Sequence, residues 1–481
     1  MHTRVSNTLT LATLLTSLGA NQIPAGATDI FVGKAVVDSR MAKPGDLFVA
    51  LRGENTDGHA YVQAAFDHGA SAALVEHATT SQSCLDLTDQ QALPMAVSAP
   101  VEIVVADVLT ALQQLAAAWR LRYKVTMIGV TGSVGKTTAK EIIATVLSQR
   151  HGTLRNPGNY NNEIGLPLTL LGLDRSHTCA VLEMGMYDLG EIALLASLAK
   201  PQIGVVMNVQ PVHLERLGTL ERIAQAKAEL LQALPEDGLA LLYGDDPLVL
   251  AMAAQTEARC TTFGLEPDND LWADHIEPLG LEGVRFVAHL RGEPEPHHLQ
   301  ISMAGRHAVL PALAAIGIGR HIGLTWPEIK AGLLAAKGAL RLTPKHGPHG
   351  ALLLDDTYNA SPSATLAALD LMRDLPGRRI ALLGDMLELG DLEEQAHRQV
   401  GRACAKLLDL LITLGPRAQI IAQAAAKAGL SKDAIVILQD KEQAIQLLQN
   451  LLQAGDIALI KGSRSMGMEV IVDALEREER V

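Results

Sequence analysis

A glycine-rich turn followed by lysine and threonine is the part of this sequence that most clearly indicates chemistry. Residues 129–138 read GVTGSVGKTT, after an apolar run at 125–130 that is typical of a strand and before a pattern typical of a helix. Small residues let successive backbone N–H groups converge on one anion, and the N-terminus of a helix adds partial positive charge. The pattern therefore predicts a loop that binds the phosphates of ATP or GTP.

Two side chains of this loop have separate expected roles. Lys136 would reach the outer phosphates, and Thr137 would ligate magnesium. Val130 occupies the first glycine position of the strict phosphate-loop pattern, so the shorter form Thr-Gly-x-x-Gly-Lys-Thr-Thr remains. A short match can arise by chance in a surface turn, but the predicted strand and helix on either side argue against chance. The residues expected around the nucleotide are Thr131, Gly132, Ser133, Val134, Gly135, Lys136, Thr137 and Thr138.

Further polar side chains lie near the ends of predicted elements in the same block. Glu183 ends an apolar run at 180–183. This is a usual place for a magnesium-binding carboxylate in a phosphate-loop sheet, although a solvated strand end would look the same. Asn159, Asn161 and Asn162 follow a Pro-Gly pair. They could cap a helix, but three amides in four positions better suit a clamp on a polar ligand.

His213 and Lys227 are each ambiguous from the residues alone. His213 follows the predicted strand 203–207. It could bind a metal through a neutral imidazole, whereas most lone histidines have no such role. Lys227 lies in a helical pattern at 223–230, where the sequence by itself indicates only a surface lysine.

Three polar clusters follow predicted strands in the last third of the chain. Residues 355–362 read DDTYNASP, after the predicted strand 352–354. They place carboxylate, hydroxyl and amide groups together at a strand exit. Residues 384–390, GDMLELG, and residues 461–469, KGSRSMGME, repeat this arrangement.

The composition is that of a large globular protein. A length of 481 residues allows about two to four domains. The net charge of −13, with no basic stripe to offset it, argues against a nucleic-acid partner but not against an anionic small ligand. Residues 1–20 lack the continuous apolar region of a signal peptide, and no apolar run of roughly 18 residues occurs. We therefore expect no membrane insertion and a cytoplasmic location. The widely spaced cysteines, which fit reduced thiols, are Cys84, Cys179, Cys260 and Cys404.

The order of predicted elements indicates an α/β protein in three blocks. Residues 1–106 combine short strands with one helix, and residues 79–100 are expected to form a long connecting loop. Residues 107–337 alternate strands and helices, which predicts a mostly parallel sheet, with an exposed excursion at 279–300. Residues 338–481 alternate more cleanly and predict a doubly wound, Rossmann-like domain. No Gly-x-Gly-x-x-Gly turn follows its strands, so no dinucleotide is expected.

Together these motifs resemble the Mur ligase family, the ATP-dependent amide-forming enzymes of peptidoglycan precursor synthesis. The resemblance covers the whole chain: residues 38–40, 43–54 and 57–59 are similar to the family's uridine-nucleotide domain. Residues 384–390 and 461–465 are its most specific parts. They resemble the members that join D-alanyl-D-alanine to UDP-N-acetylmuramoyl-tripeptide.

The resemblance implies a small α/β UDP-binding domain, a central phosphate-loop ATPase domain and a C-terminal Rossmann-like domain that closes over ATP. It implies ATP and two sites for Mg²⁺ as cofactors and an acyl-phosphate intermediate. We expect the protein to be a monomer, although the sequence does not fix the oligomeric state. In related ligases the lysine matching Lys227 is carbamylated and helps to hold a second magnesium beside the histidine matching His213. Arg341 resembles the arginine at the family's domain junction, although the usual preceding Pro-Gly is Ala339-Leu340 here.

The resemblance assigns each candidate residue a class of role. The catalytic residues are Lys136, Lys227, His213 and Arg341. The metal ligands are Thr137, Glu183, His213 and Lys227. The nucleotide site adds Asp356 to the phosphate loop. The substrate-binding residues are Ser39, Arg40, Asn159, Asn161, Asn162, Tyr358, Asn359, Lys461 and Ser463.

Departures from the family pattern lie around the nucleoside and leave the phosphate-binding residues intact. Ala308 and Pro311 stand where the family usually has two asparagines near the adenine, and Ser361 replaces another asparagine. An Asn-x-Asp-Asp pattern is replaced by residues 243–246, YGDD. These changes leave open which residues recognise the base.

Two other functions remain open from the sequence. If the similarity of residues 384–390 and 461–465 were coincidental, a ligase that adds the third amino acid, or a folylpolyglutamate synthase, would be favoured. A nucleotide-dependent binding module without catalysis is suggested only by the departures near the adenine. The presence of Lys136, Thr137, Glu183, His213 and Lys227 together argues against that alternative.

Overall fold

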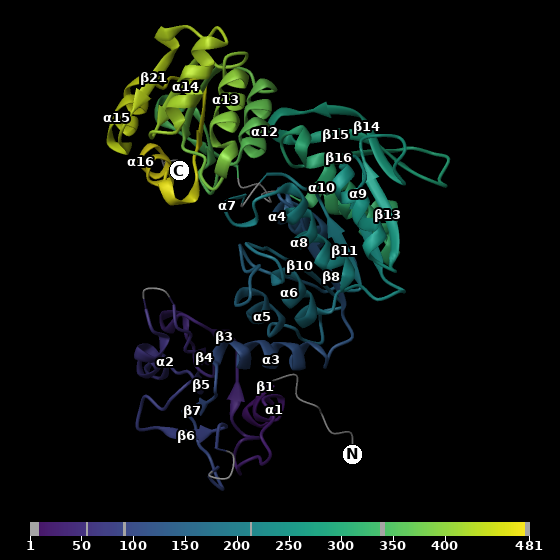
Figure 1. The fold of residues 1–481 in the computed structure, drawn as a ribbon, viewed down its shortest axis with the longest axis vertical. Coiled ribbons are helices and arrows are strands. Elements are labelled where there is room, and N and C mark those ends of the chain that lie inside the picture. The colour runs from purple at the N-terminus through teal and green to yellow at the C-terminus, as the bar shows by residue number, and fades with distance from the viewer. Residues whose placement is uncertain (1–8, 54–55, 90–92, 212–213, 337–341, 477–481) are drawn as a thin grey trace. The chain divides into compact units, whose positions relative to one another are not determined.

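The computed structural model describes residues 9–53, 56–89, 93–211, 214–336 and 342–476. The chain groups into two compact units. Unit 1 comprises residues 1–129, 151–186 and 190–203, and unit 2 comprises residues 130–150, 187–189 and 204–481. Strands and helices alternate through most of the chain, which confirms the expected α/β class (Figure 1).

A parallel five-stranded sheet forms the N-terminal part of unit 1. Its strands, in spatial order, are β3 (Ala35–Val36), β4 (Leu47–Val49), β5 (Ala72–Val75), β7 (Val101–Val104) and β6 (Ser83–Asp86). The residues of β4, β5 and β7 are buried, and α2 (Val62–Asp67) packs Val62, Ala65 and Phe66 into the same core. The remaining elements here are β1 (Leu9–Thr10), α1 (Leu11–Ser17), β2 (Phe31–Val32), η1 (Ser39–Met41), η2 (Gly58–Tyr61) and α3 (Val108–Arg120).

Residues 79–100 are more than a connecting loop, so that expectation was wrong. They contain β6, which pairs in parallel with β7 at the edge of the sheet. Only Leu85 of this strand is buried, so the segment lacks the apolar run that marks an internal strand. The carboxylate of Glu102 on β7 accepts the backbone N–H groups of Thr79 and Thr80 at 2.7 Å each, which fixes the entry to β6.

The central sheet has nine strands. In spatial order they are β16 (His297–Ile301), β15 (Val284–Leu290), β14 (Leu271–Pro278), β13 (Arg259–Gly264), β12 (Leu239–Tyr243), β11 (Ile203–Val206), β8 (Thr126–Thr131), β10 (Cys179–Glu183) and β9 (Thr153–Arg155). Strands pair in parallel from β12 to β14 and between β9 and β10, and antiparallel from β14 to β16. The sheet is therefore mixed, with the antiparallel strands at one edge.

The antiparallel edge corrects the expectation of an exposed excursion at 279–300. Phe286 and Ala288 of β15 are buried. The turn before β16 is held by Glu293, whose carboxylate accepts Trp326 Nε1 at 3.0 Å and Arg320 Nη2 at 2.8 Å. Proline and histidine at the turn obscured the alternating apolar residues of these strands. The segment is thus an ordered extension of the sheet.

The helices between and after the strands of this sheet belong to both units. They are α4 (Lys136–Leu147), α5 (Gly165–Leu170), α6 (Glu191–Ala199), α7 (Leu214–Leu217), α8 (Leu220–Gln232), α9 (Pro247–Ala251), η4 (Met252–Gln255), η5 (Gly280–Glu282), η6 (Arg306–Ala308), α10 (Val309–Ile322) and α11 (Trp326–Ala335). In unit 2, α4 packs against α10 and α11. Gly332 of α11 approaches Val146 of α4 so closely that a Cβ there would lie 2.5 Å from the Val146 Cα.

The C-terminal part of unit 2 is built on a six-stranded sheet. In spatial order its strands are β17 (Thr343–His346), β18 (Leu352–Asp356), β22 (Asp456–Lys461), β19 (Arg378–Gly384), β20 (Leu410–Leu414) and β21 (Ile435–Leu438). All neighbours are parallel except β17, which pairs antiparallel with β18. The expected Rossmann-like architecture is present, and the antiparallel edge strand was not foreseen.

Helices cover both faces of this sheet because alternate strand residues point in opposite directions. Ala381 and Leu383 of β19 join one core with α12 (Pro362–Arg373), α13 (Glu393–Cys404) and α14 (Ala418–Lys427). Ile380 and Leu382 join the other, with α15 (Lys441–Leu451) and α16 (Glu469–Leu475). Figure 1 shows α12–α14 on one side of the strands and α15 and α16 on the other. The short helices here are η7 (Pro348–Gly350), η8 (Gly390–Leu392), η9 (Lys432–Ala434) and η10 (Arg464–Met466).

Candidate nucleotide and ligation site

The predicted phosphate loop connects β8 to α4. β8 ends at Thr131 and α4 begins at Lys136, with Gly135 as its N-cap at a φ of 84°. Gly132 has a φ of 151°, and a Cβ there would lie 2.8 Å from the Cβ of Met207. Glycine is therefore required at both positions. Gly135 has a backbone conformation with positive φ, and Gly132 combines such a conformation with the close approach of Met207. The loop presents the N-terminus of α4, which is the feature that binds phosphate.

Asn208 clamps this loop from the end of β11. Its Oδ1 accepts Val134 N–H at 2.9 Å and its Nδ2 donates to the Val134 carbonyl at 2.8 Å. Ser133 adds a backbone bond to the Asn208 carbonyl at 3.0 Å, and its hydroxyl bonds with the backbone of Gln210. The loop conformation is thus fixed by protein contacts. Asn208 is not among the residues expected from the sequence, although an amide shortly after a buried strand was a signal for it.

Lys136 and Lys227 are brought together in unit 2. The Nζ of Lys136 donates to the carbonyls of Gly132 at 2.7 Å and Ser133 at 3.2 Å, so its cationic end lies over the phosphate loop. Lys227 lies on the apolar face of α8 with Ile223 and is 1% exposed. Burial, and next the positive charge of Lys136, hold the pKa of Lys227 well below its usual value of 10.5. The interpretation of Lys227 as a surface lysine is therefore wrong.

Glu183, in unit 1, is a buried carboxylate held by two asparagines. Its Oε1 accepts Asn161 Nδ2 at 2.8 Å. The side chain of Asn156 bonds with both backbone groups of Glu183, at 2.9 and 3.0 Å. These contacts orient the carboxylate at the end of β10 and exclude the alternative of a solvated strand end. Asn156 was not anticipated from the sequence.

The other two amides of this segment have different surroundings. Asn162 Oδ1 accepts the N–H of Gly165, the first residue of α5, at 2.9 Å, so its side chain binds the backbone at the start of this helix. Asn159 is exposed, and its carbonyl accepts the N–H of Asn161 at 2.7 Å. Only Asn161 directs its amide at a carboxylate.

A second group of expected residues gathers at the carboxyl ends of β18 and β22. Lys461 Nζ donates to Asp356 Oδ2 at 2.5 Å and to the Asn359 carbonyl at 2.8 Å. The ring of Tyr358 lies under the guanidinium of Arg464, whose carbon is 5.5 Å from the ring centroid. Lys461 thus orders the turn from Asp356 to Asn359. Asn359 itself is exposed.

Ser463 connects this group to the loop at 384–390. Its N–H donates to the Asp385 carbonyl at 3.0 Å, and its hydroxyl accepts Leu387 N–H at 2.9 Å. Asp385 in turn accepts the N–H of Ala418, the first residue of α14, at 2.7 Å. The two most specific motifs of the sequence are therefore adjacent in space.

Ser39 and Arg40 lie in the N-terminal part of unit 1. Ser39 is buried in η1. Arg40 is exposed and donates from Nη2 to Asp38 Oδ2 at 2.7 Å. This hydrogen bond is the main reason why the pKa of Asp38 falls to about 2.

Magnesium fits the donor set that the described residues offer. Thr137 in unit 2 offers a hydroxyl and Glu183 in unit 1 a carboxylate, and each is a hard oxygen donor of the kind that Mg²⁺ prefers beside nucleotide phosphates. No group of three or more His, Cys, Asp or Glu in the described part of the chain could hold a metal without such help. His213 and Arg341 lie outside the described residues.

The positions that depart from the family pattern have structural surroundings of their own. Ala308 and Pro311 are buried. Ser361 is the N-cap of α12, and its hydroxyl accepts Ala364 N–H at 3.4 Å. Burial and the neighbouring Asp245 raise the pKa of Tyr243 to about 12. Apolar packing thus occupies the places of the two asparagines.

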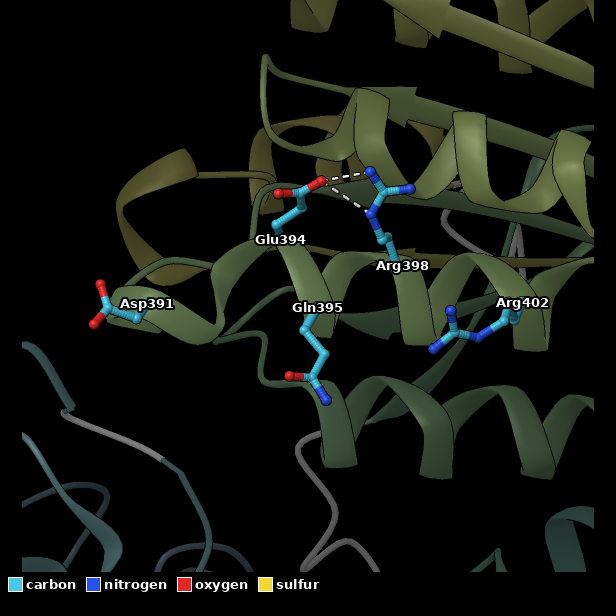
Figure 2. Close-up of a pocket in the computed structure, with 5 residues that line it drawn as sticks. All are labelled: Asp391, Glu394, Gln395, Arg398 and Arg402. Carbon is cyan, nitrogen blue, oxygen red and sulfur yellow. Dashed lines mark hydrogen bonds and ion pairs between the residues drawn. The ribbon is translucent and has the colours of Figure 1, made fainter.

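A separate hollow lies on the solvent side of α13. It has a volume of about 350 Å³ and is lined by Asp391, Glu394, Gln395, Arg398 and Arg402. Figure 2 shows Glu394 and Arg398 joined by an ion pair, with Gln395 and Arg402 also on α13 and Asp391 on the preceding η8. Its lining shares no residue with the expected site, so this hollow is not the candidate site.

Comparisons with known proteins agree along the whole chain. Residues 35–120 match the model of the Mur ligase family catalytic domain, residues 130–319 the Mur ligase middle domain, and residues 340–464 the Mur ligase glutamate ligase domain. The UDP-N-acetylmuramoyl-tripeptide–D-alanyl-D-alanine ligase of Synechocystis is 37% identical, over 94% of this chain and 93% of its own length. The enzyme of the same name from Bacillus subtilis is 37% identical, over 91% and 92%.

Solved structures give the same answer. A crystal structure of MurF from Acinetobacter baumannii superposes with a TM-score of 0.82 at 30% identity, covering 97% of this chain and 99% of that one. MurF from Thermotoga maritima in complex with ADP gives 0.76 at 28% identity, covering 92% and 96%. With three family models matched in order and full-length relatives above 30% identity, the chain belongs to the Mur ligase family.

Proposed function

We propose that this chain is an ATP-dependent amide-forming ligase that joins D-alanyl-D-alanine to UDP-N-acetylmuramoyl-tripeptide. The reaction would serve peptidoglycan precursor synthesis, and so the cell wall, cell shape and cell division. The observation that carries the proposal is the phosphate loop fixed by Asn208, with Lys136 over it, in a chain that resembles ligases of this name along its whole length.

The chemistry follows from the weakness of a carboxylate as an electrophile. Transfer of the γ-phosphoryl group of ATP to the terminal carboxylate of the tripeptide gives an acyl phosphate and ADP. The amine of D-alanyl-D-alanine, after losing a proton, attacks the acyl carbon and expels phosphate. Phosphoryl transfer depends mainly on positioning and on charge neutralisation, which a preorganised loop and Lys136 supply.

Magnesium would neutralise phosphate charge at this site. We assign the first ion to Thr137 and Glu183, and a second to His213 and a carbamylated Lys227. A neutral amine can attack CO₂ and lose a proton to form a carbamate, whereas an ammonium cannot. The lowered pKa of Lys227 therefore favours this modification, which would turn a buried cation into a hard oxygen ligand.

The remaining expected residues have proposed substrate roles. Ser39 and Arg40 would contact the UDP portion, and Arg341 would act at the domain junction. The proposed domains are residues 1–106, 107–337 and 338–481. Asp356 would bind the nucleotide, and the proposed tripeptide and dipeptide contacts are Asn159, Asn161, Asn162, Tyr358, Asn359, Lys461 and Ser463.

We place the reaction in the cytoplasm of the cell, where ATP is supplied, and propose that the protein acts as a monomer. In the described part of the chain the cysteines are unpaired by disulfides, which suits a reducing compartment. None of the helices described there has the length and apolar character needed to cross a membrane.

A phosphate-release assay tests the proposed function. ATP and UDP-N-acetylmuramoyl-tripeptide would be supplied with D-alanyl-D-alanine present or omitted, and the nucleotide product identified by mass. We expect sustained phosphate release and a product heavier by the dipeptide only when both substrates are present. Release with a free amino acid on the dipeptide-stage precursor, or with a folate and glutamate, would instead support the two alternative ligases.

A further inference from the structure

His397 is a completely buried histidine in the middle of α13, and none of the roles assigned above involves it. Its Nε2 lies 3.1 Å from the backbone N of Met386, and its Nδ1 lies 2.7 Å from the carbonyl oxygen of Glu393. A backbone N–H can only donate and a carbonyl can only accept. The imidazole must therefore be neutral, with its proton on Nδ1.

The contact with Met386 is one of three successive hydrogen bonds, or ties, from backbone N–H groups of the loop at 384–390 to side chains. Asp385 N–H points to Met466 Sδ at 2.9 Å, Met386 N–H to His397, and Leu387 N–H to Ser463 Oγ at 2.9 Å. Met466 and Ser463 belong to η10 and its N-cap, and His397 belongs to α13. No strand ladder holds these amides, so the side chains set the conformation of the loop.

The next residue of the loop has an unfavourable backbone conformation. Glu388 is exposed and has a φ of 62°, which is the left-handed region that non-glycine residues rarely adopt. Such a conformation persists only when the surrounding structure imposes it, and it is concentrated at functional sites. The ties at 385–387 are the structure that imposes it here.

The position of this loop relates it to substrate. It follows β19, and the Lys461 to Ser463 segment follows β22, which is the neighbour of β19 in the sheet. Ligands of open parallel sheets bind at the carboxyl ends of the strands. Through Ser463, the loop is bonded directly to the segment to which we assign substrate binding.

We propose that His397 is a positioning residue for ligation: its neutral imidazole holds the loop at 384–390 in the conformation that binds substrate, and protonation of the imidazole releases the loop. This proposal rests on the proposed function for its link to ligation. Its structural part, a loop whose order depends on one imidazole, stands without it.

The charges that face His397 set the direction of its titration. They are Glu393 on its own helix, Asp385 on the loop and Arg417 just before α14. Burial is the largest influence and lowers the pKa of His397, and Arg417 also lowers it, whereas Glu393 and Asp385 raise it. Arg417 is itself paired to Glu393 at 2.7 Å. The histidine is therefore neutral near pH 7, and at lower pH a protonated Nε2 would place its hydrogen against the Met386 N–H.

Three variants of the full chain separate positioning from packing. H397Q keeps an oxygen that can accept the Met386 N–H and removes the titrating group. H397N is too short to reach Met386. V400A removes buried methyl groups from the same helix face, which packs in the core, and leaves the loop ties intact. The readouts are kcat/KM for ligation from acid to neutral pH, and hydrogen exchange of residues 384–390 relative to β19.

We expect H397N to lose roughly tenfold in kcat/KM through the lost buried hydrogen bond, and H397Q to lose much less. The native chain should lose kcat/KM on the acid side together with faster exchange of the loop, and H397Q should lack this coupled change. V400A should keep the native pH profile. The proposal is overturned if H397Q and H397N behave alike, if H397Q retains the native acid limb, or if loop exchange in the native chain does not change with pH. If the native chain does not ligate but its loop exchange follows the expected pH dependence, the proposed function fails and the loop mechanism survives.

Discussion

Lys461 and Asp356 stand opposite each other on the neighbouring parallel strands β22 and β18, and their side chains form an ion pair of 2.5 Å. Both residues end their strands, and Lys461 is 2% exposed. The pair is therefore inside the protein, where either charge alone would be costly to bury. Because Lys461 also bonds to the Asn359 carbonyl, the pair joins the sheet to the proposed substrate-binding turn.

Removing one member of this pair should cost stability. D356N leaves the Lys461 ammonium with a weaker acceptor, and we expect a loss of about 1–3 kcal/mol in the free energy of unfolding. The double variant D356N/K461M should lose less than the sum of the two single changes, because neither charge remains. Urea denaturation of the four proteins measures this, and simple additivity would show that the pair contributes nothing.

The phosphate loop predicts a large effect on catalysis with little effect on folding. K136A removes the cation over the loop, and ligation should fall by roughly a thousandfold or more, since preorganised charge on a developing anion is lost. K427A, which changes an exposed lysine at the end of α14, is the control. Full activity in K136A would refute the assignment of the ATP site, provided that its thermal unfolding matches that of the native chain.

The carbamate predicted at Lys227 can be tested by chemical rescue. K227A should lose most activity, because a hard oxygen ligand for magnesium is absent, and K227E should recover little because its side chain is shorter. Short carboxylic acids or bicarbonate should partly restore K227A by filling the vacated space. Near-normal turnover of K227A at low magnesium would mean that the lysine has no part in the reaction.

Burial of Lys227 also predicts how stability depends on pH. The unfolded chain protonates this lysine below about pH 10.5, while the folded chain does so only at much lower pH. Between these two values the unfolded state binds more protons, so stability rises with pH towards 10.5. In CO₂-free buffer, K227M should therefore be more stable than the native chain near neutral pH, and the difference should shrink in alkali. A difference that is constant with pH would show that Lys227 is charged in the folded protein.

Apolar packing at Ala308 and Pro311 predicts weak selection of the base. GTP or another purine triphosphate should replace ATP better than in relatives that carry two asparagines there. The measurement is kcat/KM for each nucleotide. A preference for ATP beyond about a thousandfold, roughly 4 kcal/mol, would mean that other residues recognise adenine.

The sequence could predict those parts of this protein that are specified by residues close together along the chain. The phosphate loop lies within residues 129–138, and alternation of apolar runs with helical patterns was enough for the α/β class and the C-terminal sheet. β6 could not be found in this way, since Leu85 is its only buried residue. The pairing of β14 to β16 was hidden by polar and proline residues at the turns.

The side chains that hold the site were missed because their partners are distant along the chain. Asn208 lies 74 residues from Val134, and Asn156 lies 27 residues from Glu183. Each becomes meaningful only when two strand ends are placed side by side. His397 is closer to Met386, but its helix must first pack on the sheet before the imidazole can reach that amide.

The clamp made by Asn208 has a consequence for the kinetics of nucleotide capture. The loop backbone is already ordered by hydrogen bonds within the protein, so the binding of a triphosphate need not order it. The conformational entropy of the loop is lost when the protein folds and not when the nucleotide binds. The association rate of the nucleotide should then be set by diffusion and by attraction of the anion to Lys136. It should therefore fall as salt is added, as well as when solvent viscosity rises. The contribution of the phosphate loop to the heat-capacity change on binding should reflect only the surface that the nucleotide covers there. The triphosphate thus binds to a loop whose conformation has already formed.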